Sequence, residues 1–275
     1  MLVVIGTLFF TLVNKDKYLL EKKRVLNTVI DYGDSFKTLD PAKIRMGAEY
    51  IVLDALFSTL VEKNNNESII TSLAEKFYWK DSSLVFEIRE TYTTIDGYTI
   101  SPLDVAVSFK RLLLIQSNSH GDIAKRLQGF NDQYDIDDDV PWIDLDQNRF
   151  ILHFSQKDPR VIPMLSTIDF AVIPSLSIDR KTLKIKDFRN TTDPYYLHSE
   201  NEKFSILQKN TGYLNHGSDS PDRIQFHRGL SNSEIIFKFE KKQIDHIPTV
   251  SGLSKLETQH LALDREDVQL REVSD

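Results

Sequence analysis

The feature that most constrains the fold is a change of hydrophobic period in the middle of the chain. From Ser83 to Arg89 apolar and polar residues alternate, which predicts a half-buried strand. Asp96-Gly97 is a tight-turn signal. Ser101 and Pro102 then predict the start of a helix, with Ser101 as N-cap and Pro102 at the first helical position. A strand that leads through a turn into a helix favours a mixed fold over an all-α or all-β one.

This helix is predicted to be amphipathic. Its polar face contains Asp104, Ser108 and Arg111, and its apolar face contains Val105, Phe109 and Leu112. A second helix is predicted from Ala48 to Val61, ended by the asparagines at 64–66. Its buried face would contain Tyr50, Leu53, Phe57 and Leu60.

Further elements follow from the same patterns. Strands are expected at Val25–Ile30, Phe150–Phe154, Phe204–Leu207 and Arg223–Phe226, with a buried strand end at 171–174. Helices are expected at Pro159–Leu165 and Asn232–Glu240. The fold class is therefore α/β in the broad sense, a mixed α+β arrangement.

Charge and composition exclude several kinds of protein. The 275-residue chain has a formal net charge of −7, which argues against nucleic acid as a partner because backbone binding needs clustered Lys and Arg. It contains no cysteine, which excludes disulfides, thiol nucleophiles and cysteine-ligated metals. We predict no cofactor.

The first thirteen residues, Met1 to Val13, are almost wholly apolar. They are shorter than the roughly 20 residues of a comfortable membrane span but match the apolar region of an export signal. We expect a signal peptide or a membrane anchor in residues 1–13, followed by a charged linker to residue 24. The alternative is a buried first strand.

No arrangement in the sequence marks catalysis or a metal centre. The acidic stretch Asp132–Asp146 lacks the glycine turn and the closing glutamate of a calcium loop, so we interpret it as a solvated loop. The seven histidines form no metal-binding pair and are expected on the surface or in strands; they are His120, His153, His198, His216, His227, His246 and His260. There is no Gly-x-Ser-x-Gly elbow and no phosphate-binding glycine loop. We predict no catalytic residue and no metal ligand.

A series of short motifs resembles one family in order and spacing. Residues 38–41 (TLDP) are similar to its opening SLDP turn, 54–61 (DALFSTLV) to its lFEGLV helix, 73–77 (LAEKF) to LAesW and 84–89 (LVFEIR) to ytFkLR. Residues 96–105 (DGYTISPLDV) are similar to sDGtPlTAeDV, and 108–112 (SFKRL) to SlkRl. The similarity continues at 146–154, 158–159, 164–165, 190–195 (NTTDPY, for nGTGPY), 221–224 and 243–245. These segments resemble the oligopeptide- and dipeptide-binding family (family 5) of extracytoplasmic solute-binding proteins of ABC transporters.

The resemblance implies a class II-like periplasmic-binding fold, and it covers roughly residues 36 to 247. Family members are about twice as long, so it implies lobe one with its inserted subdomain and a missing second lobe. We expect lobe one at 25–54 and 160–275, and the subdomain at 55–159. Asp193 stands where the family has glycine, which would cost a left-handed backbone conformation if the family turn is kept.

The resemblance also implies a function. We expect the substrate-binding component of an ABC importer, not an enzyme, which captures peptides or similar small solutes outside the cytoplasmic membrane and delivers them to permease subunits. The ligand-binding residues would be Arg45, Met46 and Gly47, because the corresponding family loop faces the cleft, and Arg45 would favour a carboxylate. Two alternatives stay open: a truncated or degenerate paralogue with a regulatory or structural role, and a hydrolase with an unmarked triad.

Overall fold

The computed structural model describes residues 11–14, 25–30, 38–44, 47–64, 66–116, 121–213, 220–248, 253–254, 257, 259, 261 and 268–271. Its strands are β1 (Thr11–Asn14), β2 (Val25–Val29), β3 (Val61–Lys63), β4 (Ile69–Thr71), β5 (Ala74–Lys80), β6 (Ser83–Ile88), β7 (Ile143–Asp146), β8 (Arg149–His153), β9 (Tyr195–Glu200), β10 (Phe204–Lys209), β11 (Arg223–His227), β12 (His246–Ile247) and β13 (Val268–Arg271). Its α-helices are α2 (Gly47–Leu56), α3 (Pro102–Gln116), α4 (Gly121–Ala124), α5 (Val161–Met164) and α6 (Asn232–Glu240), with 3-10 turns η1 (Pro41–Lys43), η2 (Ile168–Phe170) and η3 (Ser175–Ser177).

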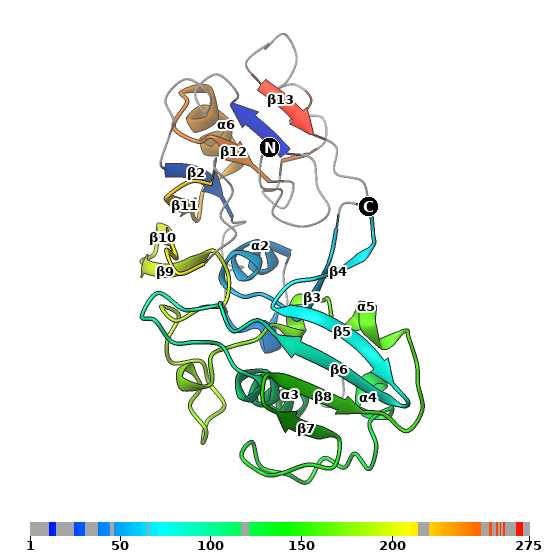
Figure 1. The fold of residues 1–275 in the computed structure, drawn as a ribbon. Coiled ribbons are helices and arrows are strands. Elements are labelled where there is room, and N and C mark those ends of the chain that lie inside the picture. Colours follow the sequence, from blue (N-terminus) through cyan, green and yellow to red (C-terminus); the bar gives the residue numbers. More distant parts are fainter. Residues whose placement is uncertain are drawn as a thin grey trace.

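A seven-stranded mixed sheet forms one end of the molecule (Figure 1), in the order β13-β1-β12-β2-β11-β10-β9. β2 pairs in parallel with both β11 and β12, whereas the other pairs are antiparallel. α6 lies between β11 and β12 in the chain and buries Ile235 and Phe239 against Val29 of β2. A capping box between Ser231 and Glu234 fixes its first turn. Because β2, β11 and β12 run parallel to one another, their carboxyl ends lie at the same edge of the sheet.

A four-stranded antiparallel sheet, β5-β6-β8-β7, forms the other end (Figure 1). Phe86 of β6 and Phe150 of β8 are fully buried, and Phe150 contacts Phe109 of α3 at a ring-centroid distance of 6.2 Å. Strand alternation explains this core, because every second side chain of β6 and β8 points to the same face.

Helix α3 lies between two hydrophobic clusters. Val105, Phe109 and Leu112 belong to the cluster under the four-stranded sheet. Val107 belongs to a second cluster, which includes Leu53 of α2 and the face of the large sheet. The helix is therefore buried on nearly all sides over its central turns, and it joins the two parts of the chain.

Most predicted elements are confirmed. The four predicted strands correspond to β2, β8, β10 and β11, and the helices predicted at 159–165 and 232–240 correspond to α5 and α6. The turn at Asp96-Gly97 is present, with Gly97 at φ +81°. Ser101 directly precedes α3, as predicted for its N-cap. The mixed α/β class is confirmed.

The helix predicted at 48–61 is too long. It ends at Leu56, and Val61 begins β3. The helix ends here because the N–H of Ser58 donates to Thr192 Oγ1 at 2.9 Å and not to a carbonyl of the helix. Asn64 lies in the β3-β4 turn, and Tyr50, predicted to be buried, is 44% exposed.

Two strand predictions need correction. Segment 171–174 is buried but forms no strand, because the N–H of Ile173 donates to Ser108 Oγ and that of Val172 to Ser58 O. β6 is not half-buried: Val85, on its outer face, is only 3% exposed.

The apolar start of the chain is only partly described. Residues 1–10 of the predicted signal or anchor, and the linker at 15–24, lie outside the described residues, whereas Thr11–Asn14 forms β1. Among the helices described, none combines the length and hydropathy needed to span a membrane.

Candidate functional site

A hollow of about 450 Å³ opens at the carboxyl edge of β2 and β11. Arg228 directly follows β11, Glu200 is the last residue of β9, and Thr38 to Lys43 belong to the segment after β2. It is lined by Thr38, Leu39, Asp40, Lys43, Lys184, Ile185, Phe188, Glu200 and Arg228. Ligands of open α/β sheets bind outside the carboxyl ends of the strands, so this is the candidate binding site.

Two ion pairs form the polar frame of the hollow. Arg111 of α3, only 2% exposed at its side chain, donates through Nη2 to Asp40 Oδ2 at 2.5 Å. Arg228 donates through Nη1 to Glu200 Oε1 at 2.7 Å. Such charge-assisted bonds are stronger and more directional than neutral ones, so both carboxylates are held in place.

The 3-10 turn after β2 is organised around the same aspartate. Asp40 is its N-cap, and its Oδ1 accepts from the N–H of Ala42 at 3.1 Å. Pro41 at the first position of the turn has the backbone angle that the turn needs. The turn implied by the resemblance at residues 38–41 is therefore present, and the carboxylate of Asp40 holds both the turn and Arg111.

One wall of the hollow is apolar. Leu39 is buried, while Ile185 and Phe188 are half-buried. Phe188 packs on Phe57 at a centroid distance of 6.3 Å. Cationic side chains and an apolar wall together suit a ligand with a charged group and a hydrophobic side chain.

Of the three predicted site residues, the structure describes one. Arg45 and Met46 lie outside the described residues, and Gly47 is the first residue of α2. Lys43, two positions before Arg45, lines the hollow. The ligand contact of Arg45, Met46 and Gly47 stays a prediction.

Sequence reasoning missed Lys184 and Arg228. Lys184 lies in a loop without a recognisable pattern, and Arg228 follows a predicted strand without any motif. The only usable signal was that Arg228 comes directly after a strand, at the edge where ligands of such sheets bind.

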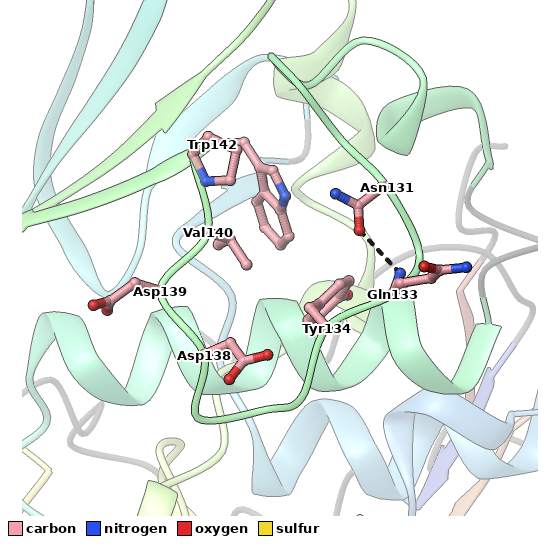
Figure 2. A pocket seen from close by; sticks show the side chains of 8 residues that line it. Asn131, Gln133, Tyr134, Asp138, Asp139, Val140 and Trp142 are labelled. Carbon is pink, nitrogen blue, oxygen red and sulfur yellow. Dashed lines mark hydrogen bonds between the residues drawn. The ribbon is translucent and has the colours of Figure 1, made fainter.

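A second hollow, of about 210 Å³, lies in the acidic loop that follows α4 (Figure 2). Trp142, only 1% exposed, and Tyr134 form its inner wall, with ring centroids 5.6 Å apart. Figure 2 shows Asp139 directed away from these rings. Asp138 Oδ2 accepts from the N–H of Asp135 at 2.8 Å, so this carboxylate supports the loop. The residues described contain no group of three or more acidic or histidine side chains placed to hold a metal ion.

Four of the histidines lie in strands, as expected: His153, His198, His227 and His246. Burial lowers the pKa of His227 and that of His246 to about 4. His153 contacts Ser83 Oγ through Nδ1 at 2.8 Å. These contacts are structural ones within the sheets.

The expected strain at Asp193 is absent. Its φ is not among the positive ones of the described chain, so a left-handed conformation is not needed there. Its Oδ1 instead accepts a hydrogen bond from Ser58 Oγ. Burial, reinforced by Asp54 and Glu62, raises its pKa well above the usual range.

Comparison with known proteins gives the class of fold. No family model and no curated protein matches the chain. The murein tripeptide binding protein MppA of Escherichia coli matches with a TM-score of 0.66 at 19% identity, over 81% of this chain and 45% of that one. An oligopeptide-binding protein, OppAIV of Borrelia burgdorferi, matches with a TM-score of 0.68 at 19% identity, over 81% of this chain and 46% of that one.

Other solutes are represented among the matches. NikA of Brucella suis, solved with Fe(III)-EDTA, has a TM-score of 0.66 at 14% identity, over 80% of this chain and 42% of that one. The chain therefore has part of the periplasmic-binding-protein fold and spans less than half the length of these structures. The boundaries of lobe one and of the inserted subdomain stay a prediction.

Proposed function

We propose that this chain is the lobe-one part of an extracytoplasmic solute-binding component of an ABC importer. The observation that carries the proposal is the hollow at the carboxyl edge of β2 and β11, within a fold shared with solute-binding proteins. Those proteins include binders of a murein tripeptide, of oligopeptides and of agropinic acid, so peptides or similar small solutes are the ligand class.

The proposed mechanism is capture without chemistry. Asp40 and Arg111 hold the η1 turn against α3, and Ile185 and Phe188 provide an apolar wall. A second lobe would close over the ligand by hinge motion, as two-lobed binders do, and permease subunits would receive the solute. Arg45, Met46 and Gly47 would contact the ligand.

The location proposed is outside the cytoplasmic membrane. Residues 11–13 of the predicted signal or anchor at 1–13 belong to β1, which pairs with β12 and β13, so the apolar residues before β1 would serve as export signal or as anchor. This rests on the likeness to periplasmic proteins and on the apolar run, and detection of the chain in a periplasmic or membrane fraction tests it.

Thermal unfolding of the full chain with a panel of di- to pentapeptides tests the function. A ligand that binds only the folded state stabilises it by about 2.7 kcal/mol at one hundred times its Kd, so binding raises the melting temperature. We expect one peptide class to do so. The variant Ile185→Gln should weaken this effect, whereas the matched variant Ile70→Gln, on the exposed surface of β4, should not.

A cooperative melt that no peptide shifts would contradict autonomous capture and favour a regulatory or structural partner. Turnover of esters or peptides by the chain would instead favour the hydrolase alternative.

A further inference from the structure

The hollow is lined by more cationic than anionic side chains. Three cations line it, Lys43, Lys184 and Arg228, against two carboxylates, Asp40 and Glu200. Each carboxylate is already engaged by an arginine, Asp40 by Arg111 and Glu200 by Arg228. The two lysines differ from Arg228: Lys43 shares Asp40 with Arg111, and Lys184 is exposed.

Lys43 lines the hollow and shares its carboxylate partner with Arg111. Its Nζ lies 3.3 Å from Asp40 Oδ2, the oxygen that also accepts from Arg111 at 2.5 Å. One carboxylate thus faces two cations, and the Lys43 side chain is 44% exposed. An anionic ligand would compete with Asp40 for the Lys43 ammonium. Because Asp40 also pairs with Arg111, the cost of moving Lys43 from Asp40 to the ligand is small.

Lys184 is placed by a tight loop. The N–H of Asp179 donates to Lys184 O at 2.9 Å, and that of Leu183 donates to Asp179 O at 2.8 Å. Arg111 Nε donates to Leu183 O at 2.7 Å, which ties the loop to α3. Within the described part of the chain the Lys184 ammonium has no ion-pair partner.

Glu49 is a third carboxylate in contact with the segment that lines the hollow. Glu49 is fully buried, and its Oε1 accepts from the N–H of Thr38 at 3.2 Å. It is thus committed to the backbone of the same segment and is not among the residues that line the hollow.

We propose that this hollow binds the carboxylate of its ligand between Lys43 and Lys184, with the ligand's apolar side chain against Leu39, Ile185 and Phe188. The ligand class is then an acid with a hydrophobic side chain, such as a peptide with a free carboxylate. This inference rests on the proposed function, and it adds the prediction that an acid binds more tightly than the matching amide.

Two pairs of probes test the charge preference. The first pair is 3-phenylpropanoate and 3-phenylpropanamide, which share their shape and differ in charge; the second is a tripeptide ending in phenylalanine and its C-terminal amide. Binding to the full chain is measured by ligand-observed NMR for the small probes and by calorimetry for the peptides. We expect each acid to bind about tenfold more tightly than its amide, because two partly exposed lysines contribute roughly 1–2 kcal/mol together.

The double variant Lys43→Gln/Lys184→Gln should abolish the preference. The matched control Lys181→Gln/Lys186→Gln removes two exposed lysines of the same loop region that do not line the hollow and should keep it. Raising NaCl from about 50 mM to about 500 mM should weaken the acids and leave the amides unchanged.

The outcomes separate the two proposals. Equal binding of acid and amide, an equal loss in both double variants, or no binding of either small probe overturns the carboxylate site. If peptides bind but acid and amide forms bind alike, the carboxylate site is wrong and the binding function stands. If no peptide binds but the phenylpropanoate preference depends on Lys43 and Lys184, the site stands and the peptide-binding function fails.

Discussion

Replacing Arg111 with methionine tests whether the buried polar face of α3 holds the binding hollow together. The guanidinium is 2% exposed and makes two contacts, with Asp40 Oδ2 at 2.5 Å and with Leu183 O at 2.7 Å. Methionine retains most of the apolar stem but donates no hydrogen bond. The variant therefore leaves a buried carboxylate and a carbonyl without their arginine.

Removal of one partner of a buried ion pair costs about 3–5 kcal/mol. Asp40 keeps the N–H of Ala42 at 3.1 Å and the ammonium of Lys43 at 3.3 Å, which places the expected loss at the lower end, about 3 kcal/mol. Since 1 kcal/mol corresponds to about 2–4 °C in a domain of this size class, the melting temperature should fall by roughly 6–12 °C.

Urea unfolding of Arg111→Met, of Asp40→Asn and of the double variant measures this. If the pair is coupled, the double variant loses clearly less than the sum of the single losses. Arg180→Met is the control, because Arg180 forms an exposed pair with Asp137 at 2.9 Å and should cost at most about 1 kcal/mol. A loss below about 1 kcal/mol for Arg111→Met, or strict additivity in the cycle, would refute the assigned role.

Three further predictions follow from buried groups elsewhere. Gly212→Ala should destabilise by about 1–3 kcal/mol in urea unfolding, because a Cβ there would lie 2.6 Å from Thr93 Oγ1 and 3.0 Å from Thr93 O; a loss under about 0.5 kcal/mol would contradict this close approach. His227 has a folded pKa of about 4 against 6.5, so the unfolded state binds the proton first and stability falls from pH 6.5 towards 4, by up to about 3 kcal/mol. His227→Gln should lack that component, and parallel pH curves of the two proteins would disprove it. Asp193 has a raised pKa, so the wild type loses stability as pH rises; Asp193→Asn keeps an acceptor for Ser58 Oγ and should melt higher than wild type at about pH 8, with the difference shrinking towards pH 5.

Local patterns predicted the periodic elements well. The alternation in 83–89 and the Ser101-Pro102 signal correspond to β6 and α3, because strand and helix periods follow from which side chains share a face. The overlong helix at 48–61 shows the limit of this reasoning. Its apolar spacing continues past Leu56, but Ser58 is bonded to Thr192, a residue far away in the chain. Tertiary contacts of this kind override local propensity.

Of the residues that line the hollow, those of the turn after β2 could be predicted from the sequence, and those from other parts of the chain could not. The turn at Asp40-Pro41 could be predicted because proline and aspartate have strong local preferences. Lys184 and Arg228 could not, since their meeting with Lys43 depends on sheet order and on a loop with no motif. A parallel pairing such as β2 with β11 joins segments that have no local signal for each other.

The polar face of α3 shows why the polarity of a residue alone does not predict whether it is exposed in this fold. Asp104, Ser108 and Arg111 have the spacing of a solvent-exposed stripe, yet all three are buried. Ser108 Oγ accepts from the N–H of Ile173 at 2.8 Å, and Asp104 Oδ1 accepts from that of Ser175 at 2.7 Å, so the stripe replaces the strand ladder that segment 171–174 lacks. Arg111 continues the same stripe to Leu183 and Asp40. Because Leu183 precedes Lys184, we expect Arg111→Met to reduce the acid preference as well as stability, whereas a purely packing role for α3 would change stability alone.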